Sequence, residues 1–212
     1  MSENNVAEYG WNSLHELNSA SYITPRILSL LKSLAVHRIL DIGSGNGAMC
    51  SQMQSLGYKV VGVEIDEKGV EISRKAHPSI PFYQYGVQND PIELLKKEAC
   101  FDAVVSTEVI EHLYSPHLLP QYASKVLRQD GYLILSTPYH GYLKNLAISM
   151  CDRWDDHHTS LWHGGHIKFW SRKTLSELLN ENGFRVIHFS GVGRMTFLWK
   201  SMVLVAQKVS AI

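Results

Sequence analysis

Two acids and a histidine follow an apolar stretch in the run T-E-V-I-E-H, which contains Glu108, Glu111 and His112. If this run turns as a helix, the i, i+3 and i+4 spacing places both carboxylates and the imidazole on one face. Such a group can bind a divalent cation, or the histidine with a partner acid can act as a general base. In the alternative interpretation, Glu108 contacts a bound cofactor and His112 packs or hydrogen-bonds within the loop.

A second group of reactive side chains lies in residues 139–170, which contain the runs Y-H-G-Y, W-D-D-H-H and W-H-G-G-H. Aromatic rings supply apolar walls, and histidines titrate near neutral pH. We therefore expect 139–170 to cap a substrate pocket, with His112, His140 and His166 as candidate bases. The alternative is a partly exposed helical insert whose histidines decorate a surface or cap helices. Its helical stretch, Leu143 to Met150, fits either a lid or a dimer face.

Three alternating glycines follow an apolar run that ends in Asp41, giving D-I-G-S-G-N-G. This order predicts a strand, a tight turn and a helix whose first N–H groups face a ligand. The turn satisfies a dinucleotide-binding pattern, and Glu64 after the next strand could hold a ribose. A carboxylate at Asp41 would, however, face a dinucleotide's pyrophosphate, where like charges repel. A ligand that carries an ammonium group would instead be favoured there.

The run from Ile39 to Gly47 resembles the first motif of the class I S-adenosylmethionine-dependent methyltransferases. The runs V-G-V-E-I-D, F-D-A-V-V-S-T-E-V-I-E-H and L-R-Q-D-G-Y-L-I-L-S-T-P resemble the later motifs in the family's order. Together these matches extend from about residue 25 to residue 208. The resemblance implies S-adenosylmethionine as cofactor and methyl transfer as the reaction.

The resemblance also implies roles for particular residues. Asp41 would meet the cofactor's ammonium through water, Glu64 would accept both ribose hydroxyls, and Ile65 would lie against the adenine. Many relatives carry an Asp after the third strand, where this chain has G-V-Q-N, so Val87 and Gln88 are expected to contribute backbone or amide contacts. The implied cofactor-binding set is Asp41, Gly43, Ser44, Gly45, Glu64, Ile65, Val87, Gln88 and Glu108.

A closer resemblance joins E-V-I-E-H to the later run H-I-K-F-W-S. Both runs resemble the ubiquinone-biosynthesis O-methyltransferases and the small-RNA 2′-O-methyltransferases. In those families the positions that match Glu108, Glu111, His112 and His166 support metal-assisted methylation of a hydroxyl, which makes a divalent cation a further expected cofactor. We expect a small-molecule hydroxyl as the acceptor. The alternatives are a metal-assisted RNA 2′-O-methyltransferase, a catalytically silent cofactor-binding partner protein and, more distantly, a NAD-dependent enzyme.

Apolar runs alternate with helical patterns along the chain, which predicts an α/β fold with helices on both faces of the sheet. The resemblance implies a doubly wound, mostly parallel seven-stranded sheet whose last strand is antiparallel. We expect a single methyltransferase domain over 1–212, with 1–24 as an N-terminal arm that packs on the domain or closes over the ligand. The predicted strands begin at Arg38, Lys59, Phe82, Phe101, Tyr132, Phe184 and Met202.

Composition narrows the choice of partners. Charged residues make up 19% of the 212 residues and the formal net charge is zero, so no broad basic field favours nucleic acid. The three cysteines are far apart, and the chain has no signal-like start or bilayer-length apolar run. We therefore expect a cytoplasmic protein with a small-molecule substrate and no membrane partner; oligomeric state is left open.

Overall fold

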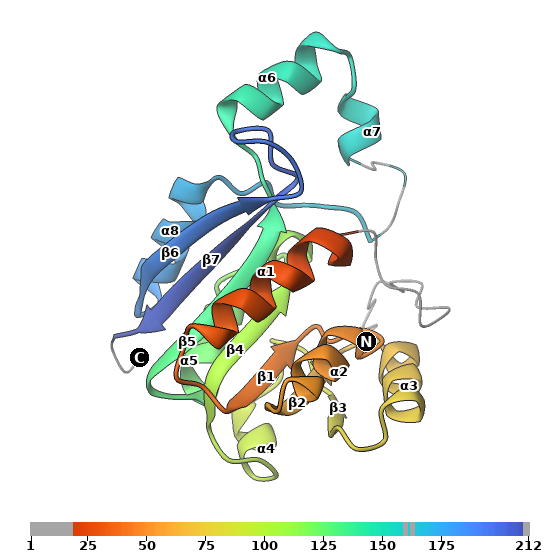
Figure 1. Ribbon diagram of the computed structural model, residues 1–212, viewed down its shortest axis with the longest axis vertical. Coiled ribbons are helices and arrows are strands. Elements are labelled where there is room, and N and C mark those ends of the chain that lie inside the picture. Colours follow the sequence, from red (N-terminus) through yellow and green to blue (C-terminus); the bar gives the residue numbers. More distant parts are fainter. Residues whose placement is uncertain (1–18, 159–160, 162–163, 210–212) are drawn as a thin grey trace, which may run out of the picture.

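Seven strands form one sheet in the order β3-β2-β1-β4-β5-β7-β6 in a computed structural model that describes residues 19–158, 161 and 164–209 (Figure 1). β7 runs antiparallel to both of its neighbours, and the other pairs are parallel. The predicted fold, with its antiparallel last strand, is confirmed. The strands are β1 (Arg38–Ile42), β2 (Lys59–Glu64), β3 (Phe82–Gln84), β4 (Phe101–Thr107), β5 (Leu127–Pro138), β6 (Phe184–Val192) and β7 (Ser201–Lys208).

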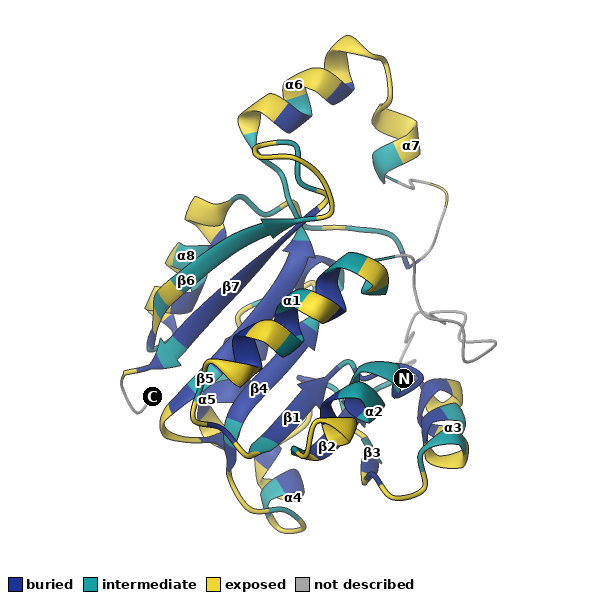
Figure 2. Ribbon diagram, viewed as in Figure 1, coloured by how far each residue is buried: buried dark blue, intermediate teal, exposed yellow. Residues whose placement is uncertain are grey.

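Helices cover both faces of this sheet, and buried strands separate them (Figure 2). One face packs against α4 (Pro91–Leu95), α5 (Leu118–Val126) and α8 (Arg172–Glu181). The other packs against α1 (Ala20–Lys32), α2 (Ala48–Ser55) and α3 (Glu67–Ala76). Because side chains alternate along a strand, Leu40 joins the first layer and Ile39 the second. Both layers thus fix the carboxyl ends of β1, β2, β4 and β5 along one edge, where such sheets bind ligands.

Helix α1 begins earlier than the sequence predicts. Pro25 is typical of a first helical turn, which predicted a start at that residue, but the helix begins at Ala20 with Pro25 inside it. Ile23 and Ile27 are buried against the sheet, and this burial offsets the hydrogen bond that proline cannot donate. The helix therefore starts within the predicted arm, whose Trp11 lies outside the described residues.

Two helices, α6 (Tyr142–Met150) and α7 (Trp154–His158), project from the sheet beyond the end of β5 (Figure 1). They form part of the expected insert, and the predicted helical stretch Leu143–Met150 is confirmed. Most of their surface is exposed, in contrast with the strands (Figure 2). Among the described residues, no helix has the length and apolar character needed to cross a bilayer.

Candidate active site

The glycine turn after β1 is tightly packed. Gly43, Gly45 and Gly47 have φ angles of 76°, 52° and 80°, which are strained for residues with a side chain. The amides of Gly43 and Ser44 donate to the Val63 carbonyl of β2 at 2.8 and 3.0 Å. A Cβ at Gly43 would lie 2.4 Å from Cγ2 of Val109, in the loop after β4. The turn therefore links three strand ends.

Asp41, near the end of β1, is a buried acid with an incomplete hydrogen-bond set. Its side chain is 1% exposed, and Oδ2 accepts from the Cys50 thiol at 3.2 Å. Oδ1 has no hydrogen-bond partner among the described residues. Burial, opposed by the Cys50 hydrogen bond, raises the pKa of Asp41 to about 7. A cationic ligand group would satisfy the open oxygen and favour the ionised form.

Glu64, at the end of β2, turns its carboxylate toward the glycine turn. Oε2 accepts from the Gly45 amide at 2.8 Å, and Oε1 accepts from the amides of Ile65 and Asp66 at 2.8 and 2.9 Å. Burial raises the pKa of Glu64, and these backbone bonds oppose the rise. Because a carboxylate oxygen can accept two hydrogen bonds, Oε1 is filled by these amides and Oε2 keeps one acceptor position. The arrangement can therefore accept one ribose hydroxyl, whereas the resemblance implied that Glu64 accepts both.

The loop after β3 contains the other two residues expected near the adenine. Val87 is 8% exposed and its side chain packs in the core, so this residue offers a ligand its backbone. The Gln88 amide folds over Gly86, where an added Cβ would lie 2.4 Å from Gln88 Oε1. Asn89 closes the loop by accepting from the Gly86 amide at 2.7 Å.

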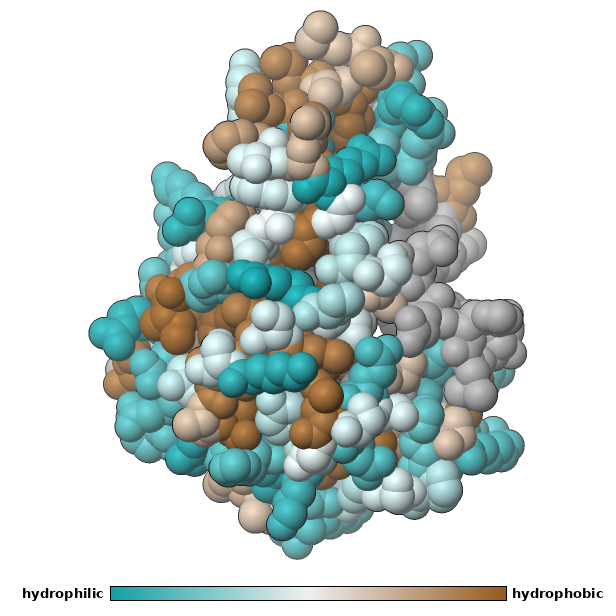
Figure 3. Space-filling model, viewed as in Figure 1, coloured by the Kyte–Doolittle hydropathy of each residue, from teal (hydrophilic) through white to brown (hydrophobic). Residues whose placement is uncertain are grey.

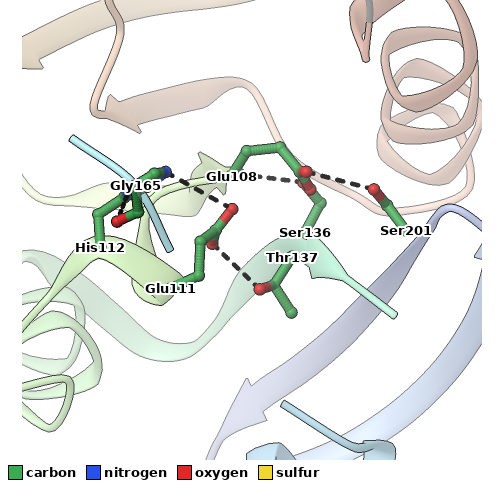
Figure 4. A network of polar contacts seen from close by, with 7 residues as sticks. All are labelled: Glu108, Glu111, His112, Ser136, Thr137, Gly165 and Ser201. Carbon is green, nitrogen blue, oxygen red and sulfur yellow. Dashed lines mark hydrogen bonds and ion pairs between the residues drawn. The ribbon is translucent and has the colours of Figure 1, made fainter. Parts of the chain in front are cut away.

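Glu108 does not share a helical face with Glu111 and His112, so that prediction is wrong. Its φ angle is 54°, and a short 3-10 helix, η1 (Ile110–His112), begins two residues later. The Glu108 carboxylate turns instead toward β5 and β7, where it accepts from Ser136 Oγ at 2.8 Å and Ser201 Oγ at 3.2 Å (Figure 4). Burial raises the pKa of Glu108 to about 7.

The structure does bring Glu111, His112 and His166 together. One ligand atom from each lies within 4.8 Å of the others. The link is the backbone, because the amides of Ile167 and Lys168 both donate to the Glu111 carbonyl at 3.0 Å. This contact joins the distant H-I-K run to η1. It brings together three of the four residues that the closer resemblance grouped, and Glu108 is the one left out.

Glu111 is the buried member of this trio. Its Oε2 accepts from Thr137 Oγ1 at 3.0 Å, whereas Oε1 has no hydrogen-bond partner among the described residues and lies 3.9 Å from His112 Nε2. Burial, reinforced by the charge of Glu108, raises the pKa of Glu111 well above its ordinary value. The open oxygen can accept a proton or a cation.

The three candidate bases fall into two groups. His112 and His166 meet edge to face, with ring centroids 5.0 Å apart. His140 instead contacts His158 and Phe169 at centroid distances of 5.9 and 5.1 Å, within the insert. Burial lowers the pKa of His112, and it lowers the pKa values of both His140 and His166 to about 4. All three imidazoles are therefore neutral at pH 7.

One residue near the site was missed by the sequence analysis. Lys144 of α6 is buried, and its Nζ donates to the Lys200 carbonyl at 3.1 Å. No sequence signal identifies it, because a lysine in a helical pattern usually lies on a solvated face. Tyr22, in the arm predicted to pack on the domain or close over the ligand, lies in α1 and reaches Ser201, the residue that also donates to Glu108.

The cofactor expected from the sequence fits these residues. S-adenosylmethionine carries an ammonium group and ribose hydroxyls, which match the open oxygen of Asp41 and the remaining acceptor position on Oε2 of Glu64. The turn leaves no side chain at Gly43 or Gly45 to hold a ligand off the backbone.

Comparison with known proteins identifies the family of this chain. A model of the methyltransferase domain family matches residues 15–189. Ubiquinone biosynthesis O-methyltransferase of Bartonella quintana is 29% identical over 88% of this chain and 82% of its own length. The Maricaulis maris protein of the same name is 35% identical over 47% of this chain and 40% of its length. The mitochondrial protein from Rattus norvegicus is 29% identical over 76% of this chain. The chain spans 48% of the rat protein.

Solved structures show the same fold. Magnesium protoporphyrin IX methyltransferase from Synechocystis, with bound S-adenosylhomocysteine, superposes with a TM-score of 0.62 at 16% identity, over 88% of this chain and 80% of that one. The [4+2]-cyclase SpnF superposes with a TM-score of 0.68 at 14% identity, over the same shares of each chain. At such identities the likeness concerns the fold alone.

Proposed function

We propose that the acceptor is a hydroxyl group of a small molecule, for a chain that belongs to the methyltransferase domain family and uses S-adenosylmethionine as its methyl donor. The printed names of the similar curated proteins, ubiquinone biosynthesis O-methyltransferases, support an oxygen acceptor. Their identity to this chain is about one third or less, so the acceptor molecule itself is not carried over.

One observation supports this proposal most directly. The neutral imidazole of His166 lies beside His112 and the open oxygen of Glu111, at the carboxyl ends of β4 and β5. A hydroxyl becomes a good nucleophile when a base removes its proton. A neutral imidazole and a buried carboxylate form a suitable pair for that task.

The site has two ends with separate tasks in the proposed reaction. Asp41 and Glu64 form the cofactor end, and Glu111, His112 and His166 form the acceptor end. S-adenosylmethionine supplies a methyl group on a positively charged sulfur. Asp41 holds its ammonium and Glu64 its ribose, which orients the methyl group toward the insert. His166 accepts the hydroxyl proton, and the aromatic side chains of 139–170 cover the acceptor and exclude water.

The test is methyl transfer from labelled S-adenosylmethionine to a panel of phenols and alcohols, with the product identified by mass spectrometry. We expect O-methylated product, and we expect His166→Ala to lower kcat about 100-fold or more, the usual contribution of a general base. The affinity for S-adenosylhomocysteine should stay within about twofold of the parent protein. His117→Ala, at an exposed histidine that precedes α5 and lies outside the insert, is the matched control and should retain activity. Methylation only at nitrogen or carbon, or unchanged turnover in His166→Ala, would contradict the proposal.

The trio of Glu111, His112 and His166 favours a second candidate, metal-assisted methylation of a hydroxyl. Two neutral imidazoles and one open carboxylate oxygen suit a divalent cation that would polarise the hydroxyl. Removal of metal by a chelator should then abolish turnover, and added Mg²⁺ should restore it. Full activity in chelator would favour the histidine base. An RNA with a free 3′ ribose belongs in the same assay, and methylation of its 2′ hydroxyl alone would favour the RNA alternative.

A further inference from the structure

Helix α6 exposes several apolar side chains and buries a lysine, which is the reverse of an ordinary surface helix. Tyr142, Leu143 and Met150 are 79%, 49% and 78% exposed, and apolar side chains are visible on the outer surface of this helix in Figure 3. Its buried residues are Lys144 and Ile148, one turn apart on its inner side. A surface helix normally buries its apolar side chains and leaves lysine in water, because an ammonium is costly to desolvate. The burial of Lys144 therefore calls for an interaction that offsets this cost.

The ammonium of Lys144 lies against the start of β7. Nζ donates to the Lys200 carbonyl at 3.1 Å, and that carbonyl also accepts from the Tyr139 amide at 3.0 Å. The next residue, Ser201, donates to the Glu108 carboxylate at 3.2 Å. Helix α6 thus directs a cation toward the end of the sheet where Glu108 lies.

Among the residues that the structure describes, this ammonium has one hydrogen-bond acceptor. It has three N–H donors, and the Lys200 carbonyl occupies one. Within the described ranges, no ion pair of 4.0 Å or less joins Lys144 to a carboxylate. Burial, assisted by the charge of Arg194, lowers the pKa of Lys144 to about 8, so it is mostly cationic at pH 7. The titratable and charged groups that interact with it come from five segments and are Glu108, His140, His158, His166 and Arg194.

We propose that Lys144 binds the negatively charged oxygen of the methyl acceptor, a role that rests on the hydroxyl-methylating function proposed above. As the acceptor O–H loses its proton to His166, charge develops on the oxygen. The oxygen electron pair forms the new O–C bond, the C–S bond breaks, and its electrons return to sulfur in S-adenosylhomocysteine. A buried ammonium whose only acceptor among the described residues is the Lys200 carbonyl stabilises that oxygen from the start of the reaction. The remaining donors of Lys144 then have a partner.

The test uses 4-nitrophenol, whose anion absorbs visible light whereas its neutral form does not. We titrate it into the protein saturated with S-adenosylhomocysteine and follow the anion band. The parent protein should bind the anion and lower the apparent pKa of the phenol. Lys144→Met should weaken binding of the anion about tenfold or more, the effect of losing one charge-assisted hydrogen bond. Lys144→Arg, which keeps the charge, should recover part of the affinity.

Arg153→Met is the matched control, because it removes one positive charge from the same insert at an exposed position. It should bind 4-nitrophenol as the parent does. Melting temperature checks that Lys144→Met is folded, and Lys144→Gln replaces it if it is not.

Three outcomes would overturn the role of Lys144. The first is equal binding of the anion by the parent and Lys144→Met proteins. The second is no binding of the anion by the parent. The third is weakened binding of S-adenosylhomocysteine by Lys144→Met, which would assign the lysine to the cofactor's carboxylate. Failure of the function itself looks different: anion binding would depend on Lys144, yet no hydroxyl in the panel would be methylated.

Discussion

Buried carboxylates lie at both ends of the site, but the chain satisfies them in different ways. At the cofactor end, Glu64 accepts hydrogen bonds from three backbone N–H groups, one in the glycine turn at Gly45 and two in the residues after Glu64 itself, Ile65 and Asp66. At the proposed acceptor end, to which we also assign Glu108 from the expected cofactor-binding set, Glu108 and Glu111 accept from hydroxyls on β5 and β7. One oxygen of Glu111 has no hydrogen-bond partner among the described residues. The cofactor end is thus built mainly from neighbouring residues, whereas the acceptor end depends on contacts between distant segments. We expect the two ends to respond separately to mutation.

The largest expected effect is at the glycine turn. Gly43→Ala forces a side chain into a positive φ, which costs about 1–2 kcal/mol, and places Cβ 2.4 Å from Val109 Cγ2. That contact is too short, so the glycine turn or the loop that carries Val109 must shift. The shift misplaces the backbone that faces the cofactor, and S-adenosylhomocysteine affinity should fall about 100-fold. Calorimetry gives the affinity, and thermal melting gives the stability.

Gly57→Ala is the matched control for this prediction, since Gly57 has a φ of 90° but nothing within 4 Å of the added Cβ. It should lose stability without losing cofactor affinity. Equal affinities for the two alanine variants would show that the close packing of Gly43 has no part in cofactor binding.

A smaller effect is expected from pH at Asp41. Its carboxyl must ionise to bind an ammonium, so affinity for S-adenosylhomocysteine should rise as pH passes through about 7. Cys50→Ala removes the thiol donor, raises the pKa of Asp41 further, and should weaken binding at pH 7 by about threefold to tenfold. At pH well above 8 the difference should shrink, and Cys50→Ser should restore the parent curve. A pH-independent affinity in the parent would contradict this role of Asp41.

The free energy of unfolding of the cofactor-free protein should fall as pH rises, whereas cofactor affinity should rise. The pKa of Asp41 rises from 3.8 to about 7 on folding, so its contribution to stability is present below pH 3.8 and is lost as pH rises through 7. Glu108 has the same sign. Bound S-adenosylhomocysteine should remove the part of this pH dependence that comes from Asp41 and leave the part that comes from Glu108. Thermal melts at pH 6 and about pH 8, with and without the ligand, measure this difference.

The smallest effect is expected away from both ends. Ser171 caps α8 by accepting from the Thr174 amide at 3.2 Å, in a capping box. Ser171→Ala should cost about 1 kcal/mol of unfolding free energy and lower the melting temperature by roughly 2–4 °C. Ser176→Ala, in the same helix, should cost less. Cofactor affinity and turnover should be unchanged in both, which sets the background for the other variants.

The sequence predicts the two ends to very different extents. Apolar runs and glycines are local signals, so the strands that hold Asp41 and Glu64 are found almost to the residue. The acceptor end resists prediction because Glu108 adopts a positive φ, which breaks the helical spacing assumed for Glu111 and His112. The closer family resemblance, rather than spacing, is what joined His166 to this group.

Lys144 could not be found from the sequence for a physical reason. Helical periodicity assigns lysine to the solvated face and leucine to the core, and α6 does the reverse. Only the three-dimensional arrangement shows which side of the helix meets the body. The start of α1 was missed for a related reason, because burial of Ile23 outweighs the helix-breaking tendency of Pro25.

The same substitution at each end tests the separation of tasks most directly. Calorimetry of S-adenosylhomocysteine binding to Glu64→Gln and Glu111→Gln compares two buried glutamates that each lose the carboxyl group and keep their size. We predict that Glu64→Gln weakens binding about tenfold or more, because an amide cannot accept from Gly45, Ile65 and Asp66 and also hold a ribose. Glu111→Gln should bind within about twofold of the parent. Weakened binding in Glu111→Gln, or parent-like binding in Glu64→Gln, would contradict the assignment of the cofactor to one end and the acceptor to the other.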